Sequence, residues 1–138
     1  KVMQADMRWT IFLMVIIGLL GCQENFDMRL ERETSDFTRK HCPQRKDGYT
    51  TLDSMTYQSA DRTIVFWYSL DNLENSGLSD RELVKQETVL RDYLIQGLRA
   101  DTKWRHCMDK NINFKYVYNA TDSSSPLISI LLTKEDYL

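Results

Sequence analysis

The sequence predicts one α+β domain whose elements follow the order α-β-β-α-β-β. Residues 62–70 are rich in β-branched and aromatic side chains, which repeat with the period of two of a strand. In residues 112–118, apolar and aromatic side chains alternate with Asn113 and Lys115. Residues 80–100 instead repeat leucine at the spacing of one helical face, and residues 27–41 show a weaker helical pattern. This order indicates a four-stranded antiparallel sheet with two helices packed on one face.

The first helix is predicted over residues 27–41, because Leu30, Thr34 and Phe37 recur on one helical face among many charged residues. It is expected to end at His41-Cys42-Pro43, since a residue that precedes proline resists the helical region.

A hairpin is predicted after this helix, beyond a loop at residues 44–48. Its strands cover residues 50–58 and 62–70, with the turn at residues 58–61. On the second strand the two faces carry different sets, namely Ile64, Phe66, Tyr68 and Leu70 on one side and Val65 and Trp67 on the other.

The helix over residues 80–100 has the strongest pattern in the chain and follows a polar loop at residues 71–77. Ser79 and Glu82 have the spacing of a capping box, in which the first hydroxyl accepts from the amide of the second residue. Two strands follow, and the turn that joins them at residues 119–126 is rich in serine and aspartate.

The two halves of this order look like a tandem αββ repeat. Arg39-Lys40-His41-Cys42 is matched by Trp104-Arg105-His106-Cys107 about 65 residues later. If the repeat is real, a pseudo-two-fold axis is expected to relate Cys42 and Cys107. Two His-Cys dipeptides also arise by chance, so both interpretations stay open.

The N-terminal residues have the three regions of a secretory signal, which predicts a signal peptide over residues 1–21. Arg8 precedes an apolar run at residues 11–21, which ends in a small residue. About eleven helical residues reach roughly 17 Å, which is short of a ~30 Å hydrocarbon core. A spanning helix and a freely secreted, cleaved chain are the weaker alternatives. Translation is expected to start at Met3 or Met7.

Leu19-Leu20-Gly21-Cys22 closes this run and resembles the lipobox of bacterial lipoproteins. The resemblance implies that the thiol of Cys22 receives a diacylglyceryl group and becomes the N-terminus. Residues 22–26 then form a tether, and residues 27–138 form the single domain. Acyl chains such as palmitate contribute roughly 0.8 kcal/mol per buried methylene, so the anchor would hold the protein in the outer or cytoplasmic membrane of the cell envelope.

An exported protein with two remaining thiols most simply pairs them, which predicts a Cys42–Cys107 disulfide. Closing a loop of about 65 residues is worth roughly 4 kcal/mol in the chain-entropy model. Two buried free thiols are the alternative. His41 and His106 add to a zinc-like inventory, but neither dipeptide has the usual ligand spacing, so no metal site is predicted.

The composition narrows the function without identifying a process. The chain has 138 residues and a formal net charge of −2, a balance that argues against a nucleic-acid partner. The sequence has no glycine-rich phosphate loop and no paired carboxylates that stand out, so no cofactor and no catalytic residue are predicted.

The leading hypothesis is a non-enzymatic envelope lipoprotein that binds another protein or a ligand through its sheet face or hairpin loops. The face away from the helices is expected to carry the candidate binding residues Val65, Trp67, Lys115 and Val117, or the aromatic set if the faces are reversed. One alternative is an inhibitor or immunity protein that neutralises a toxin or hydrolase. Another is an envelope enzyme that uses His41 or His106.

Overall fold

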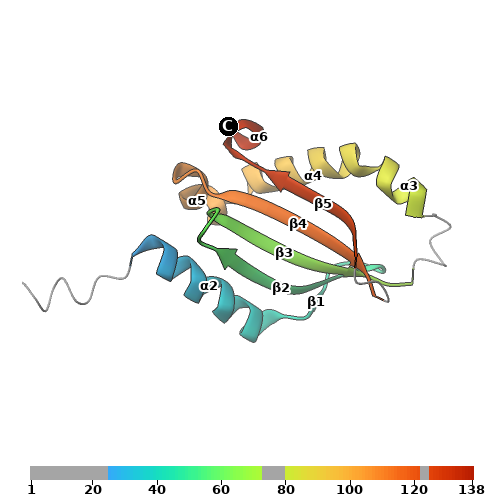
Figure 1. Ribbon diagram of the computed structural model, residues 1–138, viewed down its shortest axis with the longest axis horizontal. Coiled ribbons are helices and arrows are strands. Elements are labelled where there is room, and N and C mark those ends of the chain that lie inside the picture. Colours follow the sequence, from blue (N-terminus) through green and yellow to red (C-terminus); the bar gives the residue numbers. More distant parts are fainter. Residues whose placement is uncertain (1–24, 73–79, 122–124) are drawn as a thin grey trace, which may run out of the picture.

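The computed structural model describes residues 25–72, 80–121 and 125–138 and consists of a five-stranded sheet with helices on one side (Figure 1). The strands lie side by side in sequence order. They are β1 (Gln44–Arg45), β2 (Thr50–Gln58), β3 (Thr63–Leu70), β4 (Asn113–Ala120) and β5 (Pro126–Leu132). The helices are α2 (Phe26–His41), α3 (Asp80–Lys85), α4 (Glu87–Ala100), the 3₁₀ turn η2 (Thr102–Trp104), α5 (Arg105–Asp109) and α6 (Lys134–Tyr137).

The predicted α+β class is confirmed, but the predicted four-stranded antiparallel sheet is wrong in two respects. The additional strand, β1, is only two residues long and pairs with the first half of β2. The second difference is that β3 and β4 run parallel, with Thr63 opposite Asn113 and Leu70 opposite Ala120. The chain between them contains α3, α4, η2 and α5, and this long crossover returns it to the end of the sheet at which β3 begins.

Helix α2 begins and ends almost where the sequence predicts. The side chain of Asn25 accepts a hydrogen bond from the amide of Met28 (2.8 Å), which satisfies one of the free amides of the first turn. Cys42 ends the helix in an extended conformation, as expected for a residue before proline.

Helix α2 covers the free edge of β2 beyond the point where β1 stops. The hydroxyl of Thr38 donates to the carbonyl oxygen of Met55 (2.8 Å) and accepts from the amide of Met55 (2.9 Å). One side chain thus replaces the strand partner that Met55 lacks. At the other end of β2, the Tyr57 hydroxyl donates to Asp27 of the same helix (2.6 Å).

The helix predicted over residues 80–100 is divided at Gln86 into α3 and α4. Ser79, the first residue of the predicted capping box, lies outside the described residues. Within α4 only Leu98 is fully buried, whereas Val89 and Tyr93 are 70% and 73% exposed. Helix α4 therefore packs most tightly against the core near its C-terminal end.

The C-terminal helix α6 fixes the other end of α4. Arg91 of α4 forms an ion pair with Asp136 (2.9 Å), and Arg99 donates to the carbonyl oxygen of Tyr137 (3.1 Å). The Tyr137 ring lies edge-on to Phe114, and its hydroxyl donates to the carbonyl oxygen of Ile112 (2.9 Å). This corner holds the most completely buried side chains of the core, among them Phe114, Ile64, Ile112, Ile130 and Leu132.

Apart from the two-residue β1 and the division of the crossover into several helices, the order α-β-β occurs twice, but the pseudo-two-fold axis expected between Cys42 and Cys107 is not found. A two-fold axis between β3 and β4 would exchange β2 with β5, whereas the repeat in the sequence matches β2 with β4. The two cysteines also differ in setting, since Cys42 caps α2 while Cys107 lies inside the short α5.

Candidate functional site

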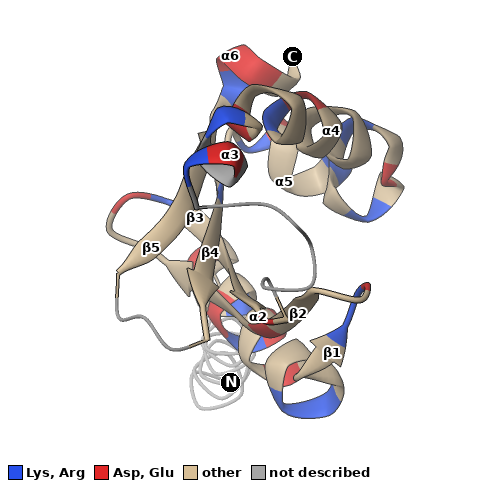
Figure 2. Ribbon diagram, turned by 90° about the vertical axis from the view of Figure 1, so that its right-hand side faces the viewer, with Lys and Arg blue, Asp and Glu red and all other residues tan. Residues whose placement is uncertain are grey.

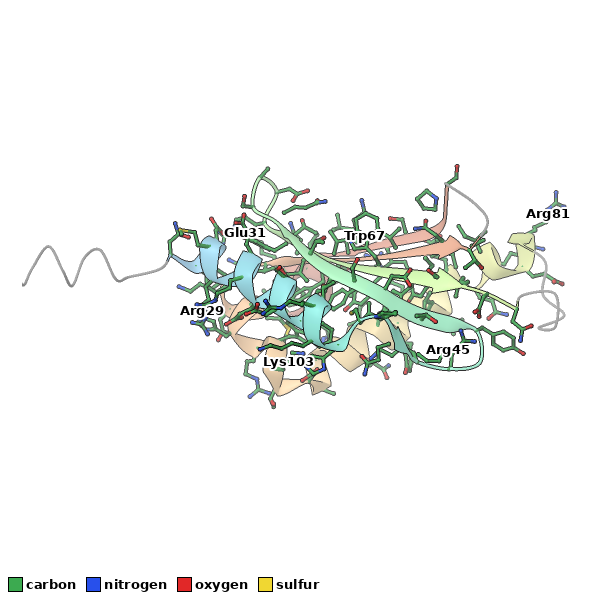
Figure 3. The ribbon with its side chains drawn as sticks, turned by 90° about the horizontal axis from the view of Figure 1, so that it is seen from below. Arg29, Glu31, Arg45, Trp67, Arg81 and Lys103 are labelled. Atoms are coloured by element: carbon green, nitrogen blue, oxygen red, sulfur yellow. The ribbon has the colours of Figure 1, made fainter. Side chains whose placement is uncertain are left out.

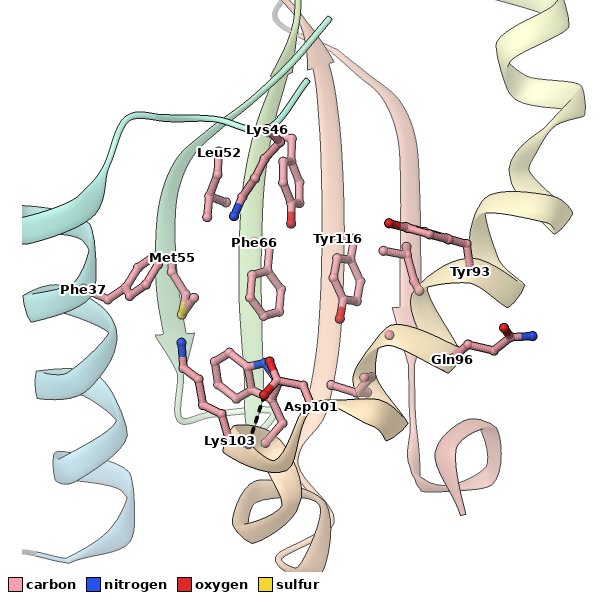
Figure 4. Close-up of a pocket in the computed structure, with 15 residues that line it drawn as sticks. Phe37, Lys46, Leu52, Met55, Phe66, Tyr93, Gln96, Asp101, Lys103 and Tyr116 are labelled. Atoms are coloured by element: carbon pink, nitrogen blue, oxygen red, sulfur yellow. Dashed lines mark hydrogen bonds between the residues drawn. The ribbon is translucent and has the colours of Figure 1, made fainter. Parts of the chain in front are cut away.

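A cleft of about 610 Å³ lies between α2 and α4 on the helix-bearing face of the sheet (Figure 4). Its floor is aromatic, with Phe66 of β3 beside Tyr116 of β4. One wall is formed by Phe37 of α2 and the other by Tyr93 and neighbouring residues of α4.

The parallel register of β3 and β4 explains the floor. It places Phe66 directly opposite Tyr116 and Tyr68 directly opposite Tyr118. Both pairs stack with ring centroids 4.7 Å apart and interplanar angles of 9° and 8°. Such pairs are worth about 0.5–1.5 kcal/mol beyond their buried area, so the floor is a rigid surface. Trp104 packs edge-on against Phe66 at 5.6 Å and closes one end.

The cleft continues along α4 beyond Tyr93. A second hollow of about 330 Å³ shares Tyr93 with the first and is lined by Val89, Leu90 and Tyr118. The most exposed apolar residues of α4 therefore face this extension or lie on its rim. The two hollows together form a groove with apolar walls along the helix.

Three tyrosines of the groove floor offer hydrogen-bond donors in an otherwise apolar surface. Burial raises the pKa of Tyr68 to about 12, and it also raises the pKa values of Tyr116 and Tyr118 well above their usual range. All three phenols are therefore neutral at physiological pH. Among the described residues their hydroxyls have no hydrogen-bond partner, which leaves them free to donate to a ligand.

Two lysines give the cleft a positive character. The ammonium of Lys103 lies 4.8 Å from the ring centroids of both Phe37 and Trp104, and thus links α2 to η2 by cation–π contacts. Lys46 lies near the opposite end (Figure 4). Neither lysine forms an ion pair within the described part of the chain. The carboxylate of Asp101, also in the lining, accepts from the amide of Lys103 (3.0 Å) and caps η2.

The candidate residues from the sequence lie on the other face of the sheet. Figure 3 shows Trp67 on the side of the sheet away from Lys103. Trp67 is paired with Val117, and Val65 with Lys115, so the four residues form one patch. Val65 and Val117 are nearly inaccessible, and the indole of Trp67 donates to the hydroxyl of Thr56 (2.9 Å). A binding role for this patch stays a prediction.

The predicted Cys42–Cys107 disulfide is absent from the structure, in which both residues are free thiols. Cys107 lines a hollow beside Leu30 and Thr34, in the first half of α2, whereas Cys42 caps the last turn. Eight to twelve helical residues separate these levels, which is roughly 12–18 Å, and a disulfide needs Cα atoms within about 7 Å. Cys22 lies outside the described residues.

We expect Cys107 to resist alkylation in the native protein, while Cys42 reacts first. Burial raises the pKa of the Cys107 thiol to about 11, so at pH 8 roughly one molecule in a thousand carries the reactive thiolate. Burial also raises the pKa of Cys42, but this residue is only half-buried. Peptide mapping after iodoacetamide treatment, with and without prior reduction, measures both sites. Equal labelling of the two, or labelling of Cys107 only after reduction, would contradict the expectation.

The two histidines lie apart, each against a phenylalanine of α2. His41 contacts Phe37 (5.0 Å between centroids) in the last turn of α2, and His106 contacts Phe26 (5.4 Å) at its start. No group of three His, Cys, Asp or Glu residues in the described part of the chain is placed to hold a metal ion. Within residues 25–72, 80–121 and 125–138, no helix has the length and apolar composition that a membrane span requires.

From the sequence, the aromatic set of these strands is expected only as an alternative binding surface, on the face away from the helices, whereas the structure places it under them. The available signal was chemical, because three floor positions carry tyrosine where a dry core usually has leucine or isoleucine. The exposed Tyr93 on the apolar face of α4 was a second signal. Their convergence depends on the parallel β3–β4 register, which the predicted antiparallel sheet did not contain.

The fold is shared with proteins of known structure at low sequence identity. A protein of Pseudomonas aeruginosa that has been assigned as secreted is 9% identical, with a TM-score of 0.64 over 84% of this chain and all of that one. The type II secretion system pilotin AspS of Vibrio cholerae is 16% identical, with a TM-score of 0.57 over 80% and 90% of the two chains. The pilotin EpsS of the Vibrio vulnificus type II secretion system is 8% identical, with a TM-score of 0.58 over 81% and 91%.

These structural similarities show the fold, whereas the family is assigned from the sequence. No protein with a curated description matches the chain. Residues 25–128 match the domain of unknown function DUF8479, which accounts for most of the chain. The chain therefore belongs to the DUF8479 family.

Proposed function

We propose that this protein is a lipid-anchored, non-enzymatic protein of the bacterial cell envelope that binds a segment of a partner protein in the cleft between α2 and α4. The observation that carries the proposal is the aromatic floor, in which the stacked, largely buried Phe66 and Tyr116 line a cleft of about 610 Å³. An apolar groove between secondary-structure elements, with a few convergent polar groups, is the usual form of a binding site.

The lining specifies the chemistry of the partner segment. The groove runs along α4 and is apolar at its floor, which suits the apolar side of an amphipathic helix. Lys46 and Lys103 are the cations of the cleft lining, so acidic side chains on the partner would complement them. The neutral phenols add hydrogen-bond donors at the floor.

The anchor and the compartment are supported by other observations. Leu19-Leu20-Gly21-Cys22 ends an apolar run and gives Cys22 as the attachment point. Two proteins that share the fold are pilotins of type II secretion systems, and a third has been assigned as secreted. A partner in a secretion apparatus of the envelope is consistent with that likeness.

A photo-crosslinking experiment in cells tests the proposal. With p-benzoylphenylalanine at position 93, on the rim of the cleft, ultraviolet light is expected to join the protein to one partner in the membrane fraction. The same substitution at Tyr49, an exposed tyrosine outside the cleft lining, is the matched control and is expected to give no such product.

Charge reversal identifies the surface that the partner uses. We expect the double variant Lys46→Glu, Lys103→Glu to reduce the crosslink at position 93 at least tenfold, and Lys115→Glu on the opposite face to leave it unchanged. The Cys22→Ser variant is expected to move the protein out of the membrane fraction. A crosslink that survives the double reversal but disappears with Lys115→Glu would place the partner on the outer face and refute the proposal.

A further inference from the structure

The two long outer strands of the sheet, β2 and β5, differ in what lies against their outer sides. The β2 edge is covered by α2, and Thr38 satisfies both backbone groups of Met55 there. Strand β5 is the other edge, and within the described residues no strand pairs with its outer side (Figure 2). Its seven residues, Pro126–Leu132, include no charged side chain. Helices α3, α4 and α6 contact β5, but they form no strand ladder with it. An apolar edge that has neither a strand partner nor a charged residue is suited to strand addition.

The sequence of β5 indicates which strand would be added. Residues 127–131 read Leu-Ile-Ser-Ile-Leu, which is a palindrome centred on Ser129. Two copies of such a strand can pair antiparallel with Ser129 opposite Ser129. Each residue of one copy then lies opposite a residue of the same type in the other copy. Leucine meets leucine, isoleucine meets isoleucine, and serine meets serine.

The side-chain directions agree with this pairing. Ile128 and Ile130 are buried under the helices, opposite Tyr118 and Tyr116 of β4. Leu127, Ser129 and Leu131 point to the other face, where Leu131 is 44% exposed. In the symmetric pair each Leu131 would lie beside Leu127 of the second copy, which covers this exposed side chain. Cross-strand pairs of this kind are the units of sheet stabilisation.

We propose that β5 pairs with β5 of a second copy of this chain, antiparallel and about a two-fold axis through Ser129. The two sheets then form one continuous ten-stranded sheet. Because the axis is perpendicular to that sheet, the helices of both copies lie on the same face. Both clefts therefore open to the same side.

A cysteine at the symmetry axis gives a readout specific to this arrangement. In membranes of cells that produce the full chain with Ser129→Cys, mild oxidation with copper phenanthroline is expected to give a band of twice the monomer mass on a non-reducing gel. Ser35→Cys, the same exchange at an exposed site on α2, and the unchanged chain are the controls and are expected to stay monomeric. No crosslink at position 129, or a crosslink only to a different protein, would overturn the proposal.

A charge-swap experiment separates loss of pairing from loss of folding. Two differently tagged copies with Ser129→Lys are expected to co-purify at less than a tenth of the unchanged level, and two copies with Ser129→Asp likewise. One Ser129→Lys copy with one Ser129→Asp copy is expected to restore co-purification, because opposite charges then meet at the axis. Restoration cannot arise from misfolded chains. Co-purification that is unchanged in the Lys–Lys pair would refute the two-fold contact at Ser129.

Discussion

Replacing Phe114 by alanine is expected to lower the free energy of unfolding by about 4 kcal/mol, because truncating a buried phenylalanine removes its transfer energy and leaves a cavity. The side chain is completely inaccessible, and two aromatic rings pack edge-on against it, those of Trp104 at 5.8 Å and Tyr137 at 5.9 Å. No rotation of a neighbour refills such a site without breaking one of these contacts. Denaturant unfolding followed by far-ultraviolet circular dichroism measures the loss.

Phe26 provides the matched control for this prediction. It is a half-buried phenylalanine at the start of α2, where it contacts His106. We expect Phe26→Ala to cost less than half as much as Phe114→Ala. Equal losses for the two variants would mean that the corner formed by η2, β4 and α6 is not the most tightly packed part of the core.

Replacing Thr38 by valine is expected to destabilise the protein by about 2–4 kcal/mol, although the two side chains have nearly the same shape. The hydroxyl of Thr38 is the partner of both the amide and the carbonyl oxygen of Met55, at the edge of β2. Valine would leave both backbone groups without a partner in a partly buried place, and each unsatisfied group costs about 1–3 kcal/mol.

Thr34→Val, one turn earlier on the same helix, is the control. It shows how much stability is lost when threonine is replaced by valine without the loss of a partner for β2. The Thr34 hydroxyl is buried, but it donates only to carbonyl oxygens of its own helix, those of Leu30 (2.8 Å) and Glu31 (3.1 Å). Those carbonyls keep their helical partners, so we expect a change within about 1 kcal/mol. The idea that Thr38 seals the strand edge would be refuted if both variants unfolded at the same denaturant concentration.

The elements with a regular pattern could be predicted from the sequence, and the connections between them could not. The alternation of side chains predicted both ends of β2 correctly, and the proline after Cys42 predicted the end of α2. The two-residue β1 has no pattern of its own, and it depends on Arg45, which bonds to Asp71 (2.8 Å) across the sheet edge. The parallel β3–β4 pairing is likewise a tertiary property, because it depends on where the crossover returns the chain.

The candidate site illustrates the same limit. Phe66 and Tyr116 lie 50 residues apart in the sequence, and each alternates correctly as a core residue of its own strand. Only their register, together with the exposed Val89 and Tyr93 on α4, shows that they line a cleft between the helices. The alternation predicted which rings share a face of the sheet, but it left open which face carries the helices and did not predict a cleft between them.

The cover that α2 places over β2 has a consequence for how copies of this protein can associate. A sheet with two open edges adds molecules at both ends, and such head-to-tail growth leads to filaments. Here α2 covers β2 through Thr38, and the edge strand β1 is only two residues long and carries Arg45. Among the described residues, β5 is therefore the one long edge strand. If β5 pairs with a second copy as proposed, association through strand pairing is therefore expected to stop at two.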